Sequence, residues 1–241
     1  MLTDCLKKAL PAVLAVIAML AVVGGVQAGT LQLGNSGWSA SWASDRDQSL
    51  SLNVDFETPD SVFIEKLAQF SVADLNPAGF VDPIVIVFQQ TSSNAKPFIA
   101  INDEQIVNNT GVVWDGFRMT ILGGPGVAFD VIRTDIAPPG SGFSISPFRT
   151  HTYVNNDTDL YVSDGFIGAG SGSENIWYPG GQSGALVING KPFQEGLRSF
   201  SFKEQPQINV IPLPPAALSG LSGLAAMSLV LCGKRLGRLF S

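Results

Sequence analysis

Hydrophobic and polar residues alternate along much of the middle of the chain, and a period of two predicts β-strands. Residues 50–56 (LSLNVDF) show the alternation most clearly. Residues 61–72 (SVFIEKLAQFSV) fit either period, and their β-branched and aromatic side chains favour a strand. Residues 84–88 (IVIVF) are continuously apolar, which predicts a strand covered on both faces.

Two more strands are predicted on either side of a turn. Residues 98–102 form the first, and residues 104–107 continue it toward the turn sequence NNTG at 108–111. Residues 112–122 return from the turn, and Trp114 is expected to be buried beside it.

Beyond residue 123 the chain is rich in glycine, which separates short apolar runs. No repeat of fixed period is visible, and no stretch of the body reads as an amphipathic helix of ten or more residues. The fold class expected is therefore all-β. Residues 29–209 are predicted to form one antiparallel β-sandwich or jelly-roll-like domain, with a signal helix before it and a transmembrane helix after it.

The N-terminal 28 residues have the layout of a signal peptide. Lys7 and Lys8 precede an apolar run over residues 9–23, and Val26-Gln27-Ala28 supplies the small residues that a signal peptidase recognises. We predict cleavage after Ala28, which leaves the body exported.

The C-terminal segment, residues 210–241, has three parts in a fixed order. Residues 211–216 (IPLPPA) are held extended by proline, and residues 216–232 carry no charge. As a helix this run of 17 residues would reach ~26 Å, against ~30 Å of bilayer hydrocarbon. A basic stop at residues 234–238, with Lys234, Arg235 and Arg238, then fixes this end in the cytoplasm.

This order of proline motif, short apolar helix and basic stop resembles the PEP-CTERM sorting signal, in the subgroup whose motif reads Val-Pro-Leu-Pro-Ala (VPLPA-CTERM). The matching residues are Ile211, Pro212, Leu213, Pro214 and, after an inserted Pro215, Ala216. The resemblance covers about the last thirty residues, and it departs from the motif in the Ile and the extra proline. It implies a bacterial envelope protein that is handed to an exosortase, a membrane-embedded processing enzyme of bacteria that often make exopolysaccharide.

Other C-terminal signals share parts of this layout. A plain membrane anchor stays open as an alternative. A sortase signal would need a Thr-Gly pair after the Leu-Pro, and residues 213–217 (LPPAA) lack it. A glycolipid-anchor signal would have a polar spacer and no basic end.

Charge and cysteine content narrow the function classes further. Once the basic residues of both terminal segments and Asp4 are set aside, the body keeps 9 basic and 19 acidic residues, a net charge near −10. Such a surface repels nucleic acid and anionic lipid. Both cysteines, Cys5 and Cys232, lie in the terminal segments, so the body has no thiol for a disulfide or a thiolate metal site.

One motif resembles the nucleophile loop of trypsin-like serine proteases. The sequence GGQSGA ends a glycine-rich loop before an apolar run, with Ser183 at the position of the nucleophile and Gln182 where that family has Asp. The chain has a single histidine, His151, and its place and spacing relative to Ser183 do not match that family. An ordinary turn before a strand is the favoured interpretation.

Two other chemistries are weaker hypotheses. Asp157, Asp159 and Asp164 are candidate calcium ligands, although their spacing is not that of an EF-hand, and turn formation is favoured instead. No carboxylate pair stands out for glycoside hydrolysis.

Exposed aromatic residues are the signature of a sugar platform. The candidates are Trp38, Trp42, Trp177 and Tyr178, although core or turn packing is the commoner role for each.

The function predicted is that of a non-enzymatic protein of the bacterial envelope or extracellular matrix, associated with exopolysaccharide or biofilm. A carbohydrate-binding β-sandwich module, permanently anchored by its C-terminal helix, is the alternative, and a secreted hydrolase ranks third. The partners expected are an exosortase-type enzyme, the inner membrane through both termini before processing, and an exopolysaccharide. Neither nucleic acid nor a cofactor is expected.

Overall fold

The computed structural model describes residues 27–135, 142–170, 172–180, 184–191 and 198–208. This part of the chain is mostly β, with two sheets and few helices. The chain divides into two units, Met1–Ile208 and Asn209–Ser241, and the second unit lies outside the described residues.

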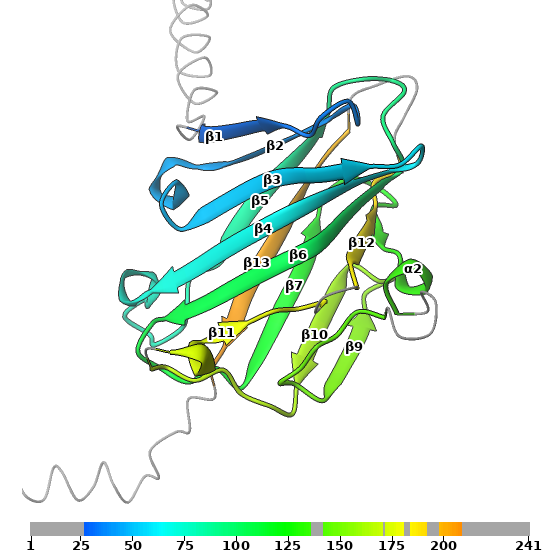
Figure 1. Ribbon diagram of the computed structural model, residues 1–241. Helices are drawn as coiled ribbons and strands as arrows, with labels where there is room; N and C mark the ends of the chain where they lie inside the picture. The colour runs from blue at the N-terminus through cyan, green and yellow to red at the C-terminus, as the bar shows by residue number, and fades with distance from the viewer. Residues whose placement is uncertain (1–26, 136–141, 171, 181–183, 192–197, 209–241) are drawn as a thin grey trace, which may run out of the picture. The chain divides into compact units, whose positions relative to one another are not determined.

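The first sheet, sheet A, has seven strands in the order β1-β2-β5-β13-β7-β10-β9, and every neighbouring pair is antiparallel (Figure 1). The strands are β1 (Gln27–Gln32), β2 (Trp38–Ala43), β5 (Ile84–Gln90), β13 (Ser199–Gln207), β7 (Gly116–Leu122), β10 (Asp159–Ser163) and β9 (Thr150–Val154). The last strand of the described chain, β13, therefore lies at the centre of sheet A.

The second sheet, sheet B, has the order β3-β4-β6-β12-β8. Its strands are β3 (Leu50–Glu57), β4 (Ser61–Ser71), β6 (Phe98–Asn109), β12 (Leu186–Asn189) and β8 (Ala128–Phe129), and the short β11 (Ile176–Trp177) also pairs with β6. The prediction of a wholly antiparallel fold is wrong here, because β4 and β6 run parallel. The strand between them in sequence, β5, belongs to sheet A, so the chain re-enters sheet B in its original direction.

One hydrophobic core serves both sheets. Alternate residues of β4 point into it, as a period of two requires, and Val62, Ile64 and Phe70 are fully buried. Aromatic rings meet between the sheets: Phe70 lies 6.0 Å from Phe117 of β7. The expectation of a strand at residues 61–72 is thus confirmed, with its end at Ser71.

Strand β5 corrects one detail of the prediction. Ile84, Ile86 and Phe88 are fully buried, whereas Val85 and Val87 are only half-buried. The strand has neighbours on both edges, β2 and β13, and packs against the core with one face. A continuous apolar run therefore marks a central strand here, and does not require cover on both faces.

The turn after β6 is held by buried polar side chains. The Asn108 amide donates to the carbonyls of Val112 and Gly168, both at 2.8 Å, and its oxygen accepts from the Thr110 hydroxyl at 2.6 Å. Trp114 is fully buried, and its indole N–H donates to the same hydroxyl at 3.2 Å. Burial of Trp114 beside this turn is as predicted.

Strand β1 begins just before the predicted signal-peptidase site. Gln27 pairs with Ala43 and Gly29 pairs with Trp42, with a bulge in the register between the two pairs. Cleavage after Ala28 would remove only the pair before the bulge, and residues 29–32 would keep their partners on β2. The cleavage site stays a prediction.

Helices are few and short in the part that the structure describes. They are α2 (Val131–Asp135) and three single turns, η1 (Ser44–Arg46), η2 (Val72–Asp74) and η3 (Ser173–Asn175). Among these residues no helix has the length and apolar character needed to span a bilayer. The predicted signal helix and the predicted helix at 216–232 lie outside the described residues.

The contacts of Asn108 lead to a stability prediction. Asn108→Ala should lower the free energy of unfolding by about 2–4 kcal/mol, because it leaves buried carbonyl groups and the Thr110 amide without partners. Denaturant unfolding of the purified protein measures this. Val113→Ala, in the same loop at a side chain that is 50 % exposed, should stay within about 0.5 kcal/mol of the parent. Equal stability of the two variants would contradict the role given to Asn108.

Candidate functional site

Three loop segments enclose a hollow of about 850 Å³, which we call the loop groove. The segments are residues 144–149, before β9; residues 164–166, after β10; and residues 173–178, which include η3 and β11. They come together because the chain returns to the same end of both sheets.

The base of the loop groove is fixed by packing and backbone hydrogen bonds. Trp177 is fully buried, pairs with Ile106 of β6, and meets the ring of Phe148 edge-on at 5.0 Å. Gly165 lies so close to the first segment that a Cβ there would stand 2.5 Å from the Pro147 carbonyl oxygen. Only glycine permits this close approach of the first two segments.

The walls of the loop groove carry two exposed rings and three charges. Phe166 is 64 % exposed and Tyr178 is 53 % exposed. Arg149, Asp164 and Glu174 also line the groove, and none of them makes a side-chain hydrogen bond or ion pair with another described residue. Aromatic faces beside unpaired donors and acceptors are suited to a ligand that is apolar on its faces and polar at its edges.

Tyr178 also borders a second, shallower hollow on the outer face of sheet B. This hollow, of about 290 Å³, is lined by polar side chains of β3, β4 and β6, among them Asn53, Glu65 and Gln105. The ring of Tyr178 thus stands between the two hollows.

The four aromatic residues considered as candidates for a sugar platform do not form one. Trp38 and Trp177 are fully buried, and Trp42 is half-buried with its indole N–H on Asp47 at 3.0 Å. Only Tyr178 of the four is well exposed. Sequence reasoning missed Phe166, whose only signal was an aromatic residue directly after the turn-forming Asp-Gly pair.

The candidate calcium ligands are not brought together. Asp157 lies in the turn before β10 and Asp164 directly follows that strand, whose five residues alone span ~16 Å at ~3.3 Å per residue. The Asp159 carboxylate is held by Arg118, Thr120 and Asn155. Burial opposes its charge, but these hydrogen bonds outweigh burial and lower the pKa of Asp159. No cluster of metal-binding side chains occurs among the described residues.

His151 has a carboxylate partner that the sequence did not indicate. Its Nε2 lies 2.9 Å from Asp135 of α2, and the Tyr153 hydroxyl donates to the same carboxylate at 3.1 Å. Burial, with Asp135 beside it, raises the pKa of Tyr153. The contacts of His151 and Tyr153 with Asp135 join the edge strand β9 to α2.

Ser183 and Gln182 lie outside the described residues, so the protease-like motif stays an untested hypothesis.

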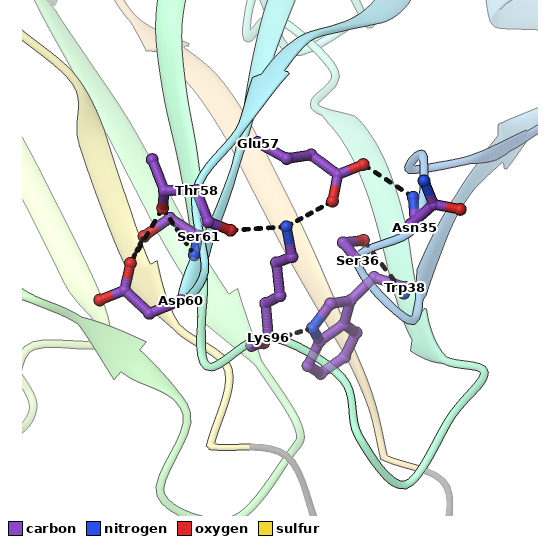
Figure 2. Close-up of polar contacts among 8 residues, drawn as sticks. All are labelled: Asn35, Ser36, Trp38, Glu57, Thr58, Asp60, Ser61 and Lys96. Atoms are coloured by element: carbon purple, nitrogen blue, oxygen red, sulfur yellow. Dashed lines mark hydrogen bonds and ion pairs between the residues drawn. The ribbon is translucent and has the colours of Figure 1, made fainter.

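A polar cluster ties one edge of sheet B to the start of sheet A (Figure 2). The Lys96 ammonium binds the Glu57 carboxylate and the Thr58 carbonyl oxygen, the latter at 2.6 Å, and Trp38 donates its indole N–H to the Lys96 carbonyl at 2.8 Å. Glu57 also accepts a hydrogen bond from the backbone N–H of Asn35 at 2.7 Å. These contacts give the residues a structural role.

A second ionic cluster lies inside the core. Lys66 of β4, Glu104 of β6 and Glu204 of β13 have fully buried side chains, and the Lys66 ammonium contacts both carboxyl groups. The sequence did carry a signal for it: in β4, Lys66 falls at the same parity as Ile64 and Ala68, on the inward face. We call this set the core triad.

The residues of the predicted sorting signal, Ile211 to Ala216 with Lys234, Arg235 and Arg238, lie outside the described residues. Their role stays a prediction.

The Lys96 contact leads to a prediction about pH. The hydrogen bond from Lys96 is the main cause that lowers the pKa of Glu57, so Lys96→Met should raise that pKa toward its ordinary value of 4.5. A lowered folded-state pKa stabilises the fold above the unfolded-state pKa, and this contribution is lost as the pH falls through the folded-state value. The variant should therefore lose part of the acid dependence of its stability.

Carboxyl NMR titration measures the pKa directly. Lys203→Met, on the outward face of β13, serves as the control and should leave Glu57 unchanged. An unmoved Glu57 titration in Lys96→Met would show that the contact is not formed in solution.

Comparison with known proteins gives no relative from which a function can be carried over. No protein-family model matches the chain, and no curated protein or solved structure is significantly similar to it. The function proposed below therefore rests on this chain's own residues.

Proposed function

We propose that this chain is a non-enzymatic exported protein of the bacterial envelope or extracellular matrix, whose β-sandwich body is sorted by an exosortase-type system. The observation that carries the proposal is the three-part order of residues 211–238, described above as resembling a PEP-CTERM signal. In this proposal the tail is a sorting signal that the exosortase-type enzyme recognises and processes after the body has crossed the membrane.

The position of the tail relative to the body supports the proposal. Strand β13 ends at Gln207, and the proline motif begins at Ile211. The motif thus follows the last strand of the described chain within a few residues of sequence. In the proposal, this short spacing leaves the motif between the folded body and the membrane, where a membrane-embedded enzyme would act on it.

The composition of the body agrees with an extracytoplasmic role. It has no cysteine and carries a net charge near −10, as counted above, so its described stabilising contacts are hydrophobic packing, hydrogen bonds and ion pairs. A body of this kind folds without an oxidising catalyst and repels anionic membrane surfaces.

The basic stop provides the test of sorting. When Lys234, Arg235 and Arg238 are replaced by Gln, the helix loses the cationic end that holds it in the membrane, and C-terminal trimming should fall at least about tenfold. Mass spectrometry of the mature C-terminus in the native host measures this, together with the fraction of protein that reaches the envelope.

A matched control replaces three basic residues of the body, Arg149, Lys191 and Lys203, by Gln and should be trimmed like the parent. An intact tail in the parent protein would support the plain anchor instead. Unaltered trimming of the tail variant would contradict the sorting proposal.

A second function, saccharide binding, is favoured by one observation, the loop groove. Sugar rings stack on aromatic faces through their C–H groups, while their hydroxyls pair with carboxylate and guanidinium side chains. Phe166 and Tyr178 supply the faces, and Arg149, Asp164 and Glu174 supply the pairing groups. Because the body is strongly acidic, a neutral polysaccharide is the ligand class that fits.

Saccharide binding is tested on the purified protein with a panel of neutral and uronate-containing oligosaccharides. Tyr178→Ala and Phe166→Ala should each weaken binding of a neutral oligosaccharide about fivefold, since a stacked ring contributes on the order of 1 kcal/mol. Phe80→Ala, at a ring that is 50 % exposed outside the groove, is the control. No binding across the panel would contradict this function, and cleavage of the sugar would support the hydrolase alternative.

A further inference from the structure

The core triad is placed by three strands of the two sheets. Lys66 of β4 lies directly opposite Glu104 of β6 in the parallel register, so their side chains leave the same face of sheet B. Glu204 approaches from sheet A, and its carboxylate lies 2.6 Å from the Lys66 nitrogen. The ring of Phe202 stands 6.0 Å from that nitrogen. An amine is thus held against two carboxyl groups in an apolar setting.

The described residues offer the triad almost no other polar partner. Both oxygens of Glu104 and one oxygen of Glu204 are buried without a hydrogen bond in this part of the chain. The Lys66 ammonium donates a hydrogen bond to Glu204 and forms an ion pair with Glu104. Buried charges with unsatisfied oxygens are costly, and a chemical change that removes the charges is correspondingly favoured.

Burial and charge within the triad act on both partners of the Lys66–Glu104 contact. Burial raises the pKa of Glu104 well above its ordinary value, and the attraction of Lys66 offsets this only in part. The pKa of Lys66 is raised, because the two carboxyl groups outweigh the effect of burial. A protonated Glu104 would leave one ammonium group and one carboxylate in the triad.

We propose that Lys66 and Glu104 join in an isopeptide bond, formed within the folded protein with Glu204 as the proton acceptor. In this reaction the Lys66 ammonium gives a proton to the Glu204 carboxylate, and the neutral amine adds to the carboxyl carbon of Glu104. The tetrahedral adduct loses its hydroxyl group as water, taking up the proton it needs from Glu204, which then receives the remaining proton of the amide nitrogen.

The balance is that of an amide condensation. One C–N bond forms, one C–O bond of Glu104 breaks, and one water leaves, with no oxidant or reductant. The products are a neutral amide and a protonated Glu204, whose hydroxyl can donate to the new amide oxygen. The buried cation and anion both disappear, so the step removes the desolvation cost of the triad.

A covalent link between Lys66 and Glu104 would stabilise the body as a disulfide stabilises other proteins. It would join β4 to β6 across their parallel pairing and restrict the unfolded chain, as a crosslink does in general. The body has no cysteine with which to achieve this.

The test is the mass of the full chain purified from its host. We expect an intact mass lower than the sequence mass, after any processing of the termini, by one water molecule. Trypsin should fail to cut after Lys66 in the denatured protein. The tryptic peptide that spans residues 47–118 should give no fragment ions from backbone cleavage between positions 66 and 104 in tandem mass spectrometry, because these two residues are linked.

Variants locate the bond. Lys66→Met and Glu204→Gln should both show the full mass, the first for lack of the amine and the second for lack of the proton acceptor. Glu65→Gln and Lys203→Met, which change the preceding residues on the same two strands, should keep the deficit of one water. Circular dichroism of each variant confirms that it is folded, and the mass of the parent decides the question even where a variant does not fold.

The outcomes separate clearly. A parent chain of full mass that trypsin cuts after Lys66 would overturn the proposal. A link from Lys66 to Glu204 would overturn the assignment of Glu104 as the carboxyl partner. A deficit of one water that maps elsewhere, such as to Asp115-Gly116 or Asp164-Gly165, where cyclisation of an aspartyl residue also releases water, would also count against it.

Discussion

The parallel pairing of β4 with β6 is the constraint on which the arrangement of both sheets depends. It has one irregularity: Ile64 pairs with Ile101, whereas Glu65 pairs with Asp103, so Asn102 is an extra residue in β6. The bulge changes which residues of β6 face inward, from odd numbers before it to even numbers after it. Glu104 reaches the core beside Lys66 for this reason. If the register ran on from Ile101 without the bulge, the position opposite Lys66 would belong to Asp103.

The strands themselves could be predicted from the sequence, because alternation is a local property. The strands at residues 50–56 and 61–72 were expected, and they are present as β3 and β4. Their pairing could not be predicted in the same way. The direction of β6 relative to β4 depends on where β5 goes, and β5 joins sheet A. Which sheet β5 joins depends on the packing of the whole core, and no single segment of the sequence determines it.

The candidate sites show the same limit. Large tryptophans such as Trp38 and Trp177 were considered as surface rings, yet their size makes them effective core residues, and both are fully buried. The loop groove is built by three segments that only the fold brings together. Lys66 could be placed on the inward face by parity, but its partners Glu104 and Glu204 come from β6 and β13, and nothing local connects the three.

The central place of β13 has a consequence for the order of assembly. Without β13, sheet A is two separate ribbons, β1-β2-β5 and β7-β10-β9, which only this strand joins. β13 is also the last strand of the described chain, and it brings Glu204 into the core. If the chain crosses a membrane from its N-terminus onward, as proposed, sheet A would stay incomplete until β13 emerged. The body would remain unfolded enough to be exported until that point. Closure of the core would coincide with arrival of the tail at the bilayer.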